Sequence, residues 1–436
     1  MNPPASCSSG PSLTWLIGFA AAPKLGAGDP PARRAILSRV GPVLSGLALA
    51  LAAGCGSPDS VAAVDEPDLK CPKGLKAVWR DKDAGTAECL VPLPGSSDSG
   101  RAPTALQMAF PSMVRPTDSL NTPERIELGR LLFFDPILSG DNTVACASCH
   151  HPNNGFTDNR PVATGINGQR GGRSAPTVWN AAFYREQFWD GRAATLEEQA
   201  KGPIQNPIEM AEDPARLITE LRAIPEYASR FTAAFGGQAA EAITLDHIAS
   251  AIAAFERTLL AVNTPFDRYA AGDSGAMPPA AVRGLNLFRS VSTRCFECHG
   301  TPTFANPDFK VIGVPSVKDT GKLDEDIGRG ALVPGKAYLN AFKIPTLRNI
   351  AKTAPYMHNG VFKTLDEVLT FYAEGGGLGH GYHPDNIDDK IRKFDLAASE
   401  KADLIAFLNA LTDESLLPEI PPRVPSGLPV PAGPLP

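Results

Sequence analysis

The stretch Cys146-Ala147-Ser148-Cys149-His150 decides the fold of this chain, together with its counterpart Cys295-Phe296-Glu297-Cys298-His299. Each has the pattern C-x-x-C-H, the attachment signal for a c-type haem. The two thiols form thioethers to the porphyrin, and the histidine becomes an axial iron ligand. By chance, this composition would give roughly 0.002 such patterns. We therefore expect two covalent haems; redox-active or structural cysteine pairs are the alternative.

Size and charge restrict the remaining classes. The chain has 436 residues, of which 43% are hydrophobic and 20% charged. These proportions are typical of a soluble globular protein with two or three domains. The formal net charge of -6 provides no basic footprint for nucleic acid.

The N-terminal region, residues 1–55, is predicted to be an export segment. Arg33, Arg34 and Arg39 precede an apolar run, 40–53, that is too short to span a bilayer comfortably. Small residues before Cys55 resemble a bacterial lipoprotein cleavage site, with Cys55 as the lipidated residue; plain secretion remains the alternative. Either route leads to the periplasm, where haem attachment and disulfides are both permitted.

Residues 56–118 are polar and rich in Pro and Gly, and we interpret them as a tether with a small segment closed by a disulfide. Cys71 and Cys89 are the pair expected to form it. Closing a loop of that size would stabilise the region by about 3 kcal/mol.

Helix signals dominate from residue 119 onward. Thr122, Thr195, Thr244, Thr364 and Ser399 are expected N-caps. The helix after Thr244 carries an apolar stripe of Leu245, Ile248, Ile252, Phe255 and Leu259. We predict a mainly α fold of two tandem cytochrome c-like haem domains with long loops, an N-terminal one over 119–270 and a C-terminal one over 271–417. The Pro-rich tail, 418–436, is expected to be disordered.

Several longer motifs resemble the bacterial di-haem cytochrome c peroxidase and MauG superfamily. They are LGRLLFFD at 128–135, LSGDN at 138–142, FWDGRA at 188–193, LEEQA at 196–200, PTLRN at 345–349 and TAPYMHNG at 353–360. The resemblance covers about residues 119–412. It implies two cytochrome c-like domains that face each other, with a peroxidatic haem in the first, an electron-relaying haem in the second and a calcium ion near their interface.

The resemblance also assigns site residues. Trp189 matches the tryptophan between the haems, and Gln199 and Glu209 match the polar pair over the peroxidatic haem, with Pro203 beside them. Thr353 and Pro355 match backbone calcium ligands, whereas Ser174 stands where the family usually has Asn, a better oxygen ligand. Glu209 is our choice for the proton-transferring group, since an apolar haem pocket raises the pKa of a carboxyl. Taken alone, each residue also has a simpler interpretation, as a core or loop residue.

Two positions depart from the peroxidases. Ile166 aligns with a distal His that many of them use, so we expect the first iron to keep an open sixth position; His151 is expected to be idle. Tyr372 aligns with the methionine ligand of the second haem, as in MauG-like enzymes. A phenolate favours oxidised iron. Other candidates for that ligand are Met357, His358, His380 and His383.

These features together predict an exported di-haem peroxidase that reduces hydrogen peroxide. Its electron donor is either a small redox protein, such as a cytochrome c or cupredoxin, or an aromatic side chain of a partner protein, as for MauG. A non-catalytic di-haem electron carrier is the alternative, and it would need two six-coordinate haems.

Overall fold

The computed structural model describes residues 76–81, 86–90, 121–382 and 385–434. The export segment with Cys55, and Cys71 of the expected disulfide, lie outside these residues, as does His383. Within the tether, β1 (Lys76–Asp81) pairs antiparallel with β2 (Thr86–Leu90), and Ala77 lies opposite Cys89. The tether therefore contains a hairpin, and the Cys71–Cys89 disulfide stays a prediction.

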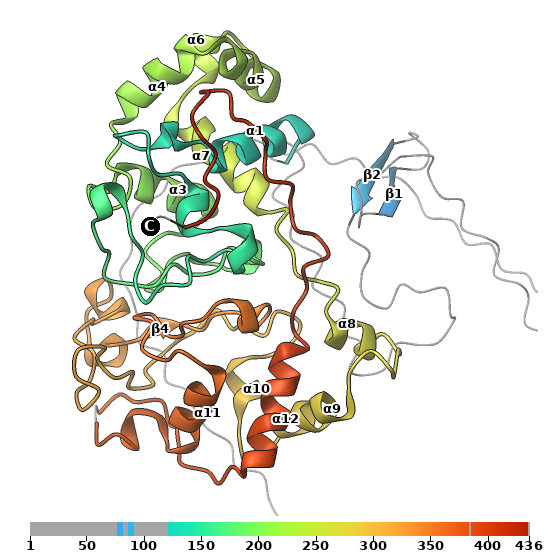
Figure 1. The fold of residues 1–436 in the computed structure, drawn as a ribbon, viewed down its shortest axis with the longest axis vertical. Helices are drawn as coiled ribbons and strands as arrows, with labels where there is room; N and C mark the ends of the chain where they lie inside the picture. Colours follow the sequence, from blue (N-terminus) through green and yellow to red (C-terminus); the bar gives the residue numbers. More distant parts are fainter. Residues whose placement is uncertain (1–75, 82–85, 91–120, 383–384, 435–436) are drawn as a thin grey trace, which may run out of the picture. The chain divides into compact units, whose positions relative to one another are not determined.

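Two groups of helices build the rest of the chain (Figure 1). The first group consists of α1 (Pro123–Phe133), α2 (Cys146–Cys149), α3 (Leu196–Gln205), α4 (Pro214–Ala223), α5 (Pro225–Phe235), α6 (Ala239–Ala242) and α7 (Leu245–Glu256). The second consists of α8 (Pro265–Ala270), α9 (Pro279–Phe288), α10 (Cys295–Cys298), α11 (Leu365–Ala373) and α12 (Ala398–Asn409), with the short antiparallel pair β3 (Phe309–Lys310) and β4 (Phe342–Lys343). Long loops connect them, with 3-10 turns at Pro136–Leu138, Pro152–Asn154, Ile166–Gly168, Ala181–Phe183, Arg329–Ala331, Lys336–Tyr338, Ile350–Lys352 and Gly376–Leu378. The mainly α prediction is confirmed.

Local capping chemistry explains where the helices start. The hydroxyls of Thr122, Thr195, Thr244 and Thr364 each accept a hydrogen bond from the backbone N–H three residues later. The last helix differs, because it begins at Ala398 rather than after Ser399. Its first turn is closed by the Glu400 carboxylate, which accepts from the Ala397 N–H at 2.9 Å.

Each group of helices encloses its own core. In the N-terminal half α1 crosses α7, and a Cβ on Gly129 would lie 1.8 Å from the Ala251 carbonyl oxygen. In the C-terminal half α9 crosses α12, where a Cβ on Gly284 would lie 1.9 Å from the Asp403 carbonyl oxygen. Both crossings are close because glycine has no side chain. Phe266 of α8 packs in the C-terminal core, and the 270/271 domain boundary stays a prediction.

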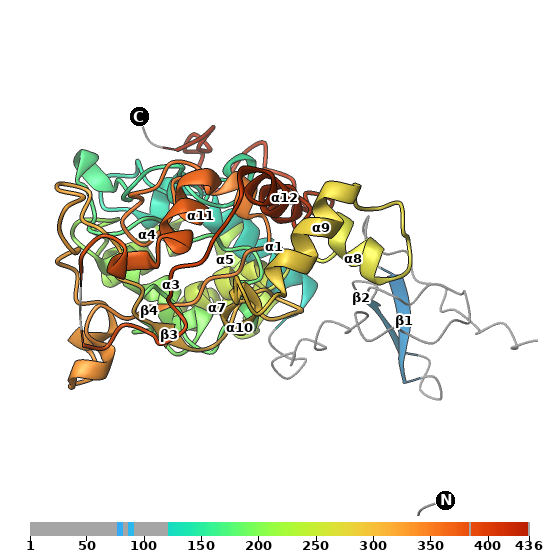
Figure 2. The ribbon, with the colours of Figure 1, turned by 90° about the horizontal axis from the view of Figure 1, so that it is seen from below.

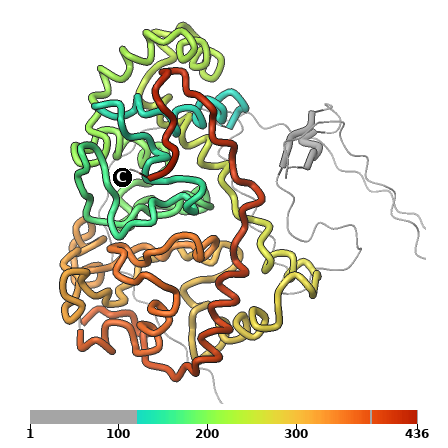
Figure 3. Tube along the Cα trace, in the orientation of Figure 1, coloured from blue at the N-terminus to red at the C-terminus, as the bar shows by residue number. Residues whose placement is uncertain are grey.

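The tail is ordered over residues 418–434, so the prediction of disorder is wrong there. It leaves the end of α12 and runs back across the N-terminal half (Figures 1 and 3). Val424 is buried in the N-terminal core. The Ser426 hydroxyl donates to Asp135 at 2.6 Å, and Arg423 pairs with Glu226 at 2.9 Å. The tail has apolar residues between its prolines, and burial of their side chains stabilises it against the N-terminal half. A prediction based on the proline content alone does not take this burial into account.

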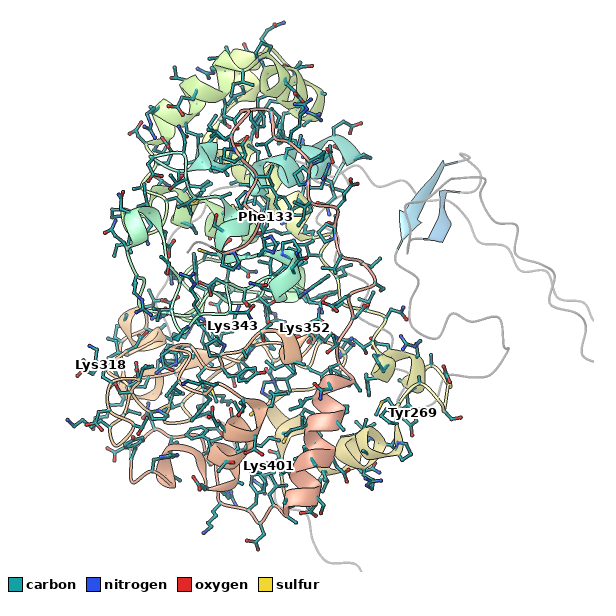
Figure 4. All side chains as sticks on the ribbon, in the orientation of Figure 1. Phe133, Tyr269, Lys318, Lys343, Lys352 and Lys401 are labelled. Carbon is teal, nitrogen blue, oxygen red and sulfur yellow. The ribbon has the colours of Figure 1, made fainter. Side chains whose placement is uncertain are left out.

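Polar contacts join the two halves. The Arg173 guanidinium forms a two-bond fork to Asp326 and a third bond to Asp190. Lys343 and Lys352, labelled in Figure 4, lie along this seam, and the view in Figure 2 shows the same elements from below. No helix among the described residues is long and apolar enough to cross a membrane.

Candidate functional site

One cavity of about 710 Å³ runs through both halves of the protein. Its wall includes both C-x-x-C-H motifs, together with the residues singled out around them by sequence, namely Trp189, Gln199, Pro203, Glu209, Thr353, Pro355 and Tyr372. The sequence therefore predicted residues that the fold collects around a single space. Cavities of this volume bind cofactor-sized molecules.

The two motif histidines have matching hydrogen bonds. His150 directs Nδ1 to the Phe156 carbonyl at 3.1 Å, and His299 directs Nδ1 to the Phe304 carbonyl at 2.9 Å. Because a carbonyl accepts a hydrogen bond, each Nδ1 carries the proton and each Nε2 has its lone pair available for a metal. Both rings line the cavity. This is the arrangement that an axial haem ligand requires.

The motif cysteines lack the chemistry of a redox-active pair. Burial raises the pKa of Cys149 to about 12 and that of Cys295 to about 11. Catalytic C-x-x-C thiols instead have lowered pKa values that favour the thiolate. The short helices α2 and α10 present the four thiols to the cavity, two in each half. The residues present therefore fit two covalently attached haems.

A polar group on the N-terminal side of the cavity comes from α3 and the loop after it. Gln199 and Pro203 are four residues apart on α3, so they share the face that lines the cavity. Glu209 follows the helix, and its backbone carbonyl accepts from the Ile166 N–H at 2.8 Å. Burial raises the pKa of the Glu209 carboxyl, although the Arg192 charge opposes the shift. Such a carboxyl is suited to hold and release a proton.

Ile166 and His151 do not reach the cavity. The Ile166 side chain is buried in the N-terminal core. His151 is also buried, and its Nδ1 accepts from the Asn153 N–H at 3.3 Å. Met210, next to Glu209, does line the cavity, and the sequence analysis did not consider it.

Trp189 lies in the wall shared by the two halves. Its indole N–H donates to the Ser174 carbonyl at 2.9 Å, and its own carbonyl accepts from the Lys343 N–H at 2.8 Å. The His358 ring meets the indole edge-on at 6.5 Å between centroids. The indole is thus fixed by contacts from both halves of the chain.

Tyr372 occupies the cavity wall on the C-terminal side, on the same face of α11 as Val368. Burial is the main cause that raises the pKa of its phenol. Of the alternative ligands, Met357 and His358 also line the cavity, whereas His380 does not. The His358 ring is held by Asp324 at 3.3 Å and stacks on Phe342.

The expected calcium ligands also meet at the cavity wall. Thr353 and Pro355 line it, with Ser174 nearby. The Asn159 amide donates to the carbonyls of Lys352 and Ala354, on either side of Thr353, which fixes this turn. The carbonyls of Thr353 and Pro355 accept no backbone hydrogen bond from a described residue. Neutral oxygens of this kind suit a weakly bound calcium ion. Among the described residues, no cluster of three or more His, Cys, Asp or Glu side chains offers another metal site.

Sequence reasoning did not single out several charged residues of the wall, among them Arg173, Glu256 and Lys343. Lys343 lies over the Tyr184 ring at 3.7 Å, and burial lowers its pKa to about 7. Nothing in their local sequence distinguishes them, since each becomes part of the wall through contacts with distant segments.

Comparisons with known proteins agree with this geometry. A family model described as di-haem cytochrome c peroxidase matches residues 123–275. The methylamine utilization protein MauG of Methylorubrum extorquens is 38% identical over 315 residues, which is 71% of this chain and 85% of that protein. The cytochrome c551 peroxidase of Pseudomonas aeruginosa is 36% identical over 296 residues, 68% of this chain and 80% of that protein.

A solved structure resembles the fold as well. A MauG-like protein described as associated with microbial copper homeostasis matches with a TM-score of 0.64 and 33% identity, covering 71% of this chain and 96% of its own. The expected cytochrome c-like architecture is thereby confirmed. The chain belongs to the di-haem cytochrome c peroxidase and MauG family of oxidoreductases.

Proposed function

We propose that the protein is an exported di-haem peroxidase that reduces hydrogen peroxide in the N-terminal part of the cavity, with Trp189 as the electron path from the C-terminal haem site. The observation that carries this proposal is the single cavity, in which two oriented histidines and the partly buried Glu209 carboxyl share one wall with Trp189. Family membership supports peroxide as the substrate.

When bound, the haems would supply the redox chemistry; His150 and His299 would bind the irons, and the four motif cysteines would form the covalent links. The protein must then manage protons, because one hydrogen peroxide takes up two protons and two electrons to give two waters. Glu209 is the residue we assign to this task. Its raised pKa lets the carboxylate accept a proton from peroxide and return it to the leaving oxygen near neutral pH. Gln199, with an amide that both donates and accepts, would orient the substrate.

Electrons would cross the wall between the halves through the indole of Trp189. Its hydrogen bond to the Ser174 carbonyl holds the ring in place, and His358 packs against its edge. An aromatic ring at this point would divide the electron path between the two haem sites into two shorter steps. Tyr372 is the residue we assign as the sixth ligand of the second iron, where a phenolate would favour the oxidised state.

The donor is either a small redox protein or a Trp or Tyr side chain on a partner protein. Among the described residues, His150 is the one histidine of the N-terminal half that lines the cavity. Together with Tyr372, this favours the second option, a MauG-like enzyme. A non-catalytic electron carrier is less well supported, since it has no use for a titratable carboxyl beside Gln199.

Two further assignments complete the proposal. Calcium would bind weakly at the carbonyls of Thr353 and Pro355 and the hydroxyl of Ser174, and would stiffen the wall beside Trp189. Export to the periplasm, with a lipid on Cys55 as an anchor, would deliver the chain to the compartment in which c-type haems are attached.

The test is a spectrum of the oxidised holoprotein before and after one equivalent of peroxide, with and without a reduced small cytochrome. We expect the Soret bands of both haems to change without prior reduction, and peroxide to be consumed in the presence of the donor. Two six-coordinate haems whose spectra do not change on addition of peroxide would instead identify an electron carrier.

A further inference from the structure

Glu256, at the C-terminal end of α7, is a buried carboxyl on the cavity wall that the proposed reaction does not use. It is 5% exposed and lines the cavity together with Ile252, one helical turn earlier. Its Oε2 atom is buried and makes no hydrogen bond with any described residue. A buried ionised carboxylate without a partner costs several kcal/mol, so the group must be protonated or must bind water.

The neighbouring Arg257 has a complementary deficiency. Its Nη1 atom is also buried without a described partner, while Nη2 donates to Glu197 of α3 at 2.7 Å. The Glu197 side chain is 24% exposed, so this ion pair reaches solvent. An ordered water is stable where two or more polar atoms are free to bind it. The two unsatisfied atoms belong to consecutive residues, one that lines the cavity and one whose ion pair reaches solvent.

We propose that Glu256 is a second proton-holding residue of the cavity and that its proton is replaced from solvent along the Arg257–Glu197 pair. This inference rests on the proposed function, because it gives the peroxide reaction its supply of protons. In each turnover the O–H bond of the Glu256 carboxyl breaks and the proton passes into the cavity by way of water. A proton from solvent then re-forms the bond, so the residue ends unchanged.

The charges around Glu256 are consistent with this role. Burial is the main cause that raises its pKa to about 8, Arg257 lowers it and Glu197 raises it. Cys146 of α2 also faces it, but as a thioether that group would not titrate. On the other side of α7, α1 carries Arg130 and Glu127, which bond to each other at 2.8 Å. The carboxyl is therefore expected to be neutral at neutral pH and to ionise under mildly alkaline conditions.

The test is an infrared pH titration of the oxidised holoprotein, which follows the C=O band of a protonated carboxyl. We expect a band that disappears only above the ordinary titration range of a glutamic acid, because burial raises the pKa of Glu256. The band should be absent from Glu256→Gln and should persist in the control Glu212→Gln. Glu212 is equally buried but is bonded to Arg216 and lies off the cavity. Glu197→Gln should lower the midpoint and Arg257→Gln should raise it.

A band that remains in Glu256→Gln, or a midpoint unaffected by both neighbouring substitutions, would overturn the inference. Haem content by mass spectrometry checks that the variants are loaded. If the Gln variant does not fold, Glu256→Asp takes its place, and a shifted midpoint is expected while an unchanged one contradicts the assignment. The pH profile of peroxide reduction should lose its alkaline limb in Glu256→Gln. If no variant reduces peroxide but the band behaves as described, the proposed function fails and the proton-holding assignment stands.

Discussion

Replacing Arg173 by Met removes the ion-pair fork that joins the two halves beside Trp189. The Arg173 guanidinium binds Asp326 at 2.6 and 2.9 Å and Asp190 at 2.6 Å. Removing one partner of a fully buried pair costs about 3–5 kcal/mol, and an exposed pair is worth about 0–1 kcal/mol. The Arg173 side chain is 21% exposed and that of Asp190 8%. Discounting for this exposure, we expect the variant to lose roughly 2–3 kcal/mol of unfolding free energy.

A surface fork in the same protein provides the matched control. Arg283 binds Asp403 with distances of 2.7 and 2.6 Å, but its side chain is 61% exposed. Arg283→Met should therefore cost far less unfolding free energy than Arg173→Met. Urea unfolding of both holoproteins at neutral pH, followed by haem absorbance, measures the difference. Equal losses in the two variants would refute the argument that burial strengthens the seam.

The pH dependence of the Arg173 effect has a definite sign. Burial alone would raise the pKa of Asp190 and of Asp326, but hydrogen bonds from Arg173 outweigh it and hold both pKa values below normal. Groups with lowered pKa values contribute stability that is present above the unfolded pKa and disappears as the pH falls through the folded value. The gap between wild type and Arg173→Met should thus narrow below about pH 4.

Three further predictions concern activity, ligation and packing. Glu209→Gln should lower kcat/KM for peroxide by about 100- to 10,000-fold. It should also abolish the acid limb of the pH profile, whose midpoint in the wild type lies above the ordinary glutamate pKa. An unchanged pH profile would exclude Glu209 as the proton-transferring residue. Tyr372→Phe should change the absorption and electron paramagnetic resonance of the C-terminal haem alone, and identical spectra remove Tyr372 as a ligand. Gly284→Ala gains about 1 kcal/mol of helix propensity but places a Cβ 1.9 Å from the Asp403 carbonyl oxygen. We therefore expect urea unfolding to show a net loss of about 1–3 kcal/mol of unfolding free energy. Increased stability would show that α9 and α12 can move apart.

Local signals in the sequence predicted much of this protein. The haem motifs specify their own cofactor chemistry, and the caps at Thr122, Thr195, Thr244 and Thr364 act within one helical turn, so both could be identified without a fold. The predicted start of α12 was wrong because the Glu400 side chain, three residues after the N-cap Ala397, closes the first turn of the helix.

Features made by distant contacts could not be predicted in this way. The apolar stripe of α7 concealed Glu256, whose burial depends on the packing of α3 and α7 around the cavity. The tail was read as disordered from its prolines, yet Val424 and Ser426 bind a core built some 300 residues earlier in the chain. The Arg173 fork likewise joins residues separated by 153 positions.

Electron paramagnetic resonance of the oxidised, two-haem protein tests the central claim most directly. The account predicts one high-spin signal from the N-terminal haem, whose iron has His150 on one side and no protein ligand on the other, beside one low-spin signal from the C-terminal haem. Two low-spin signals, with both irons held by protein on both faces, would contradict it.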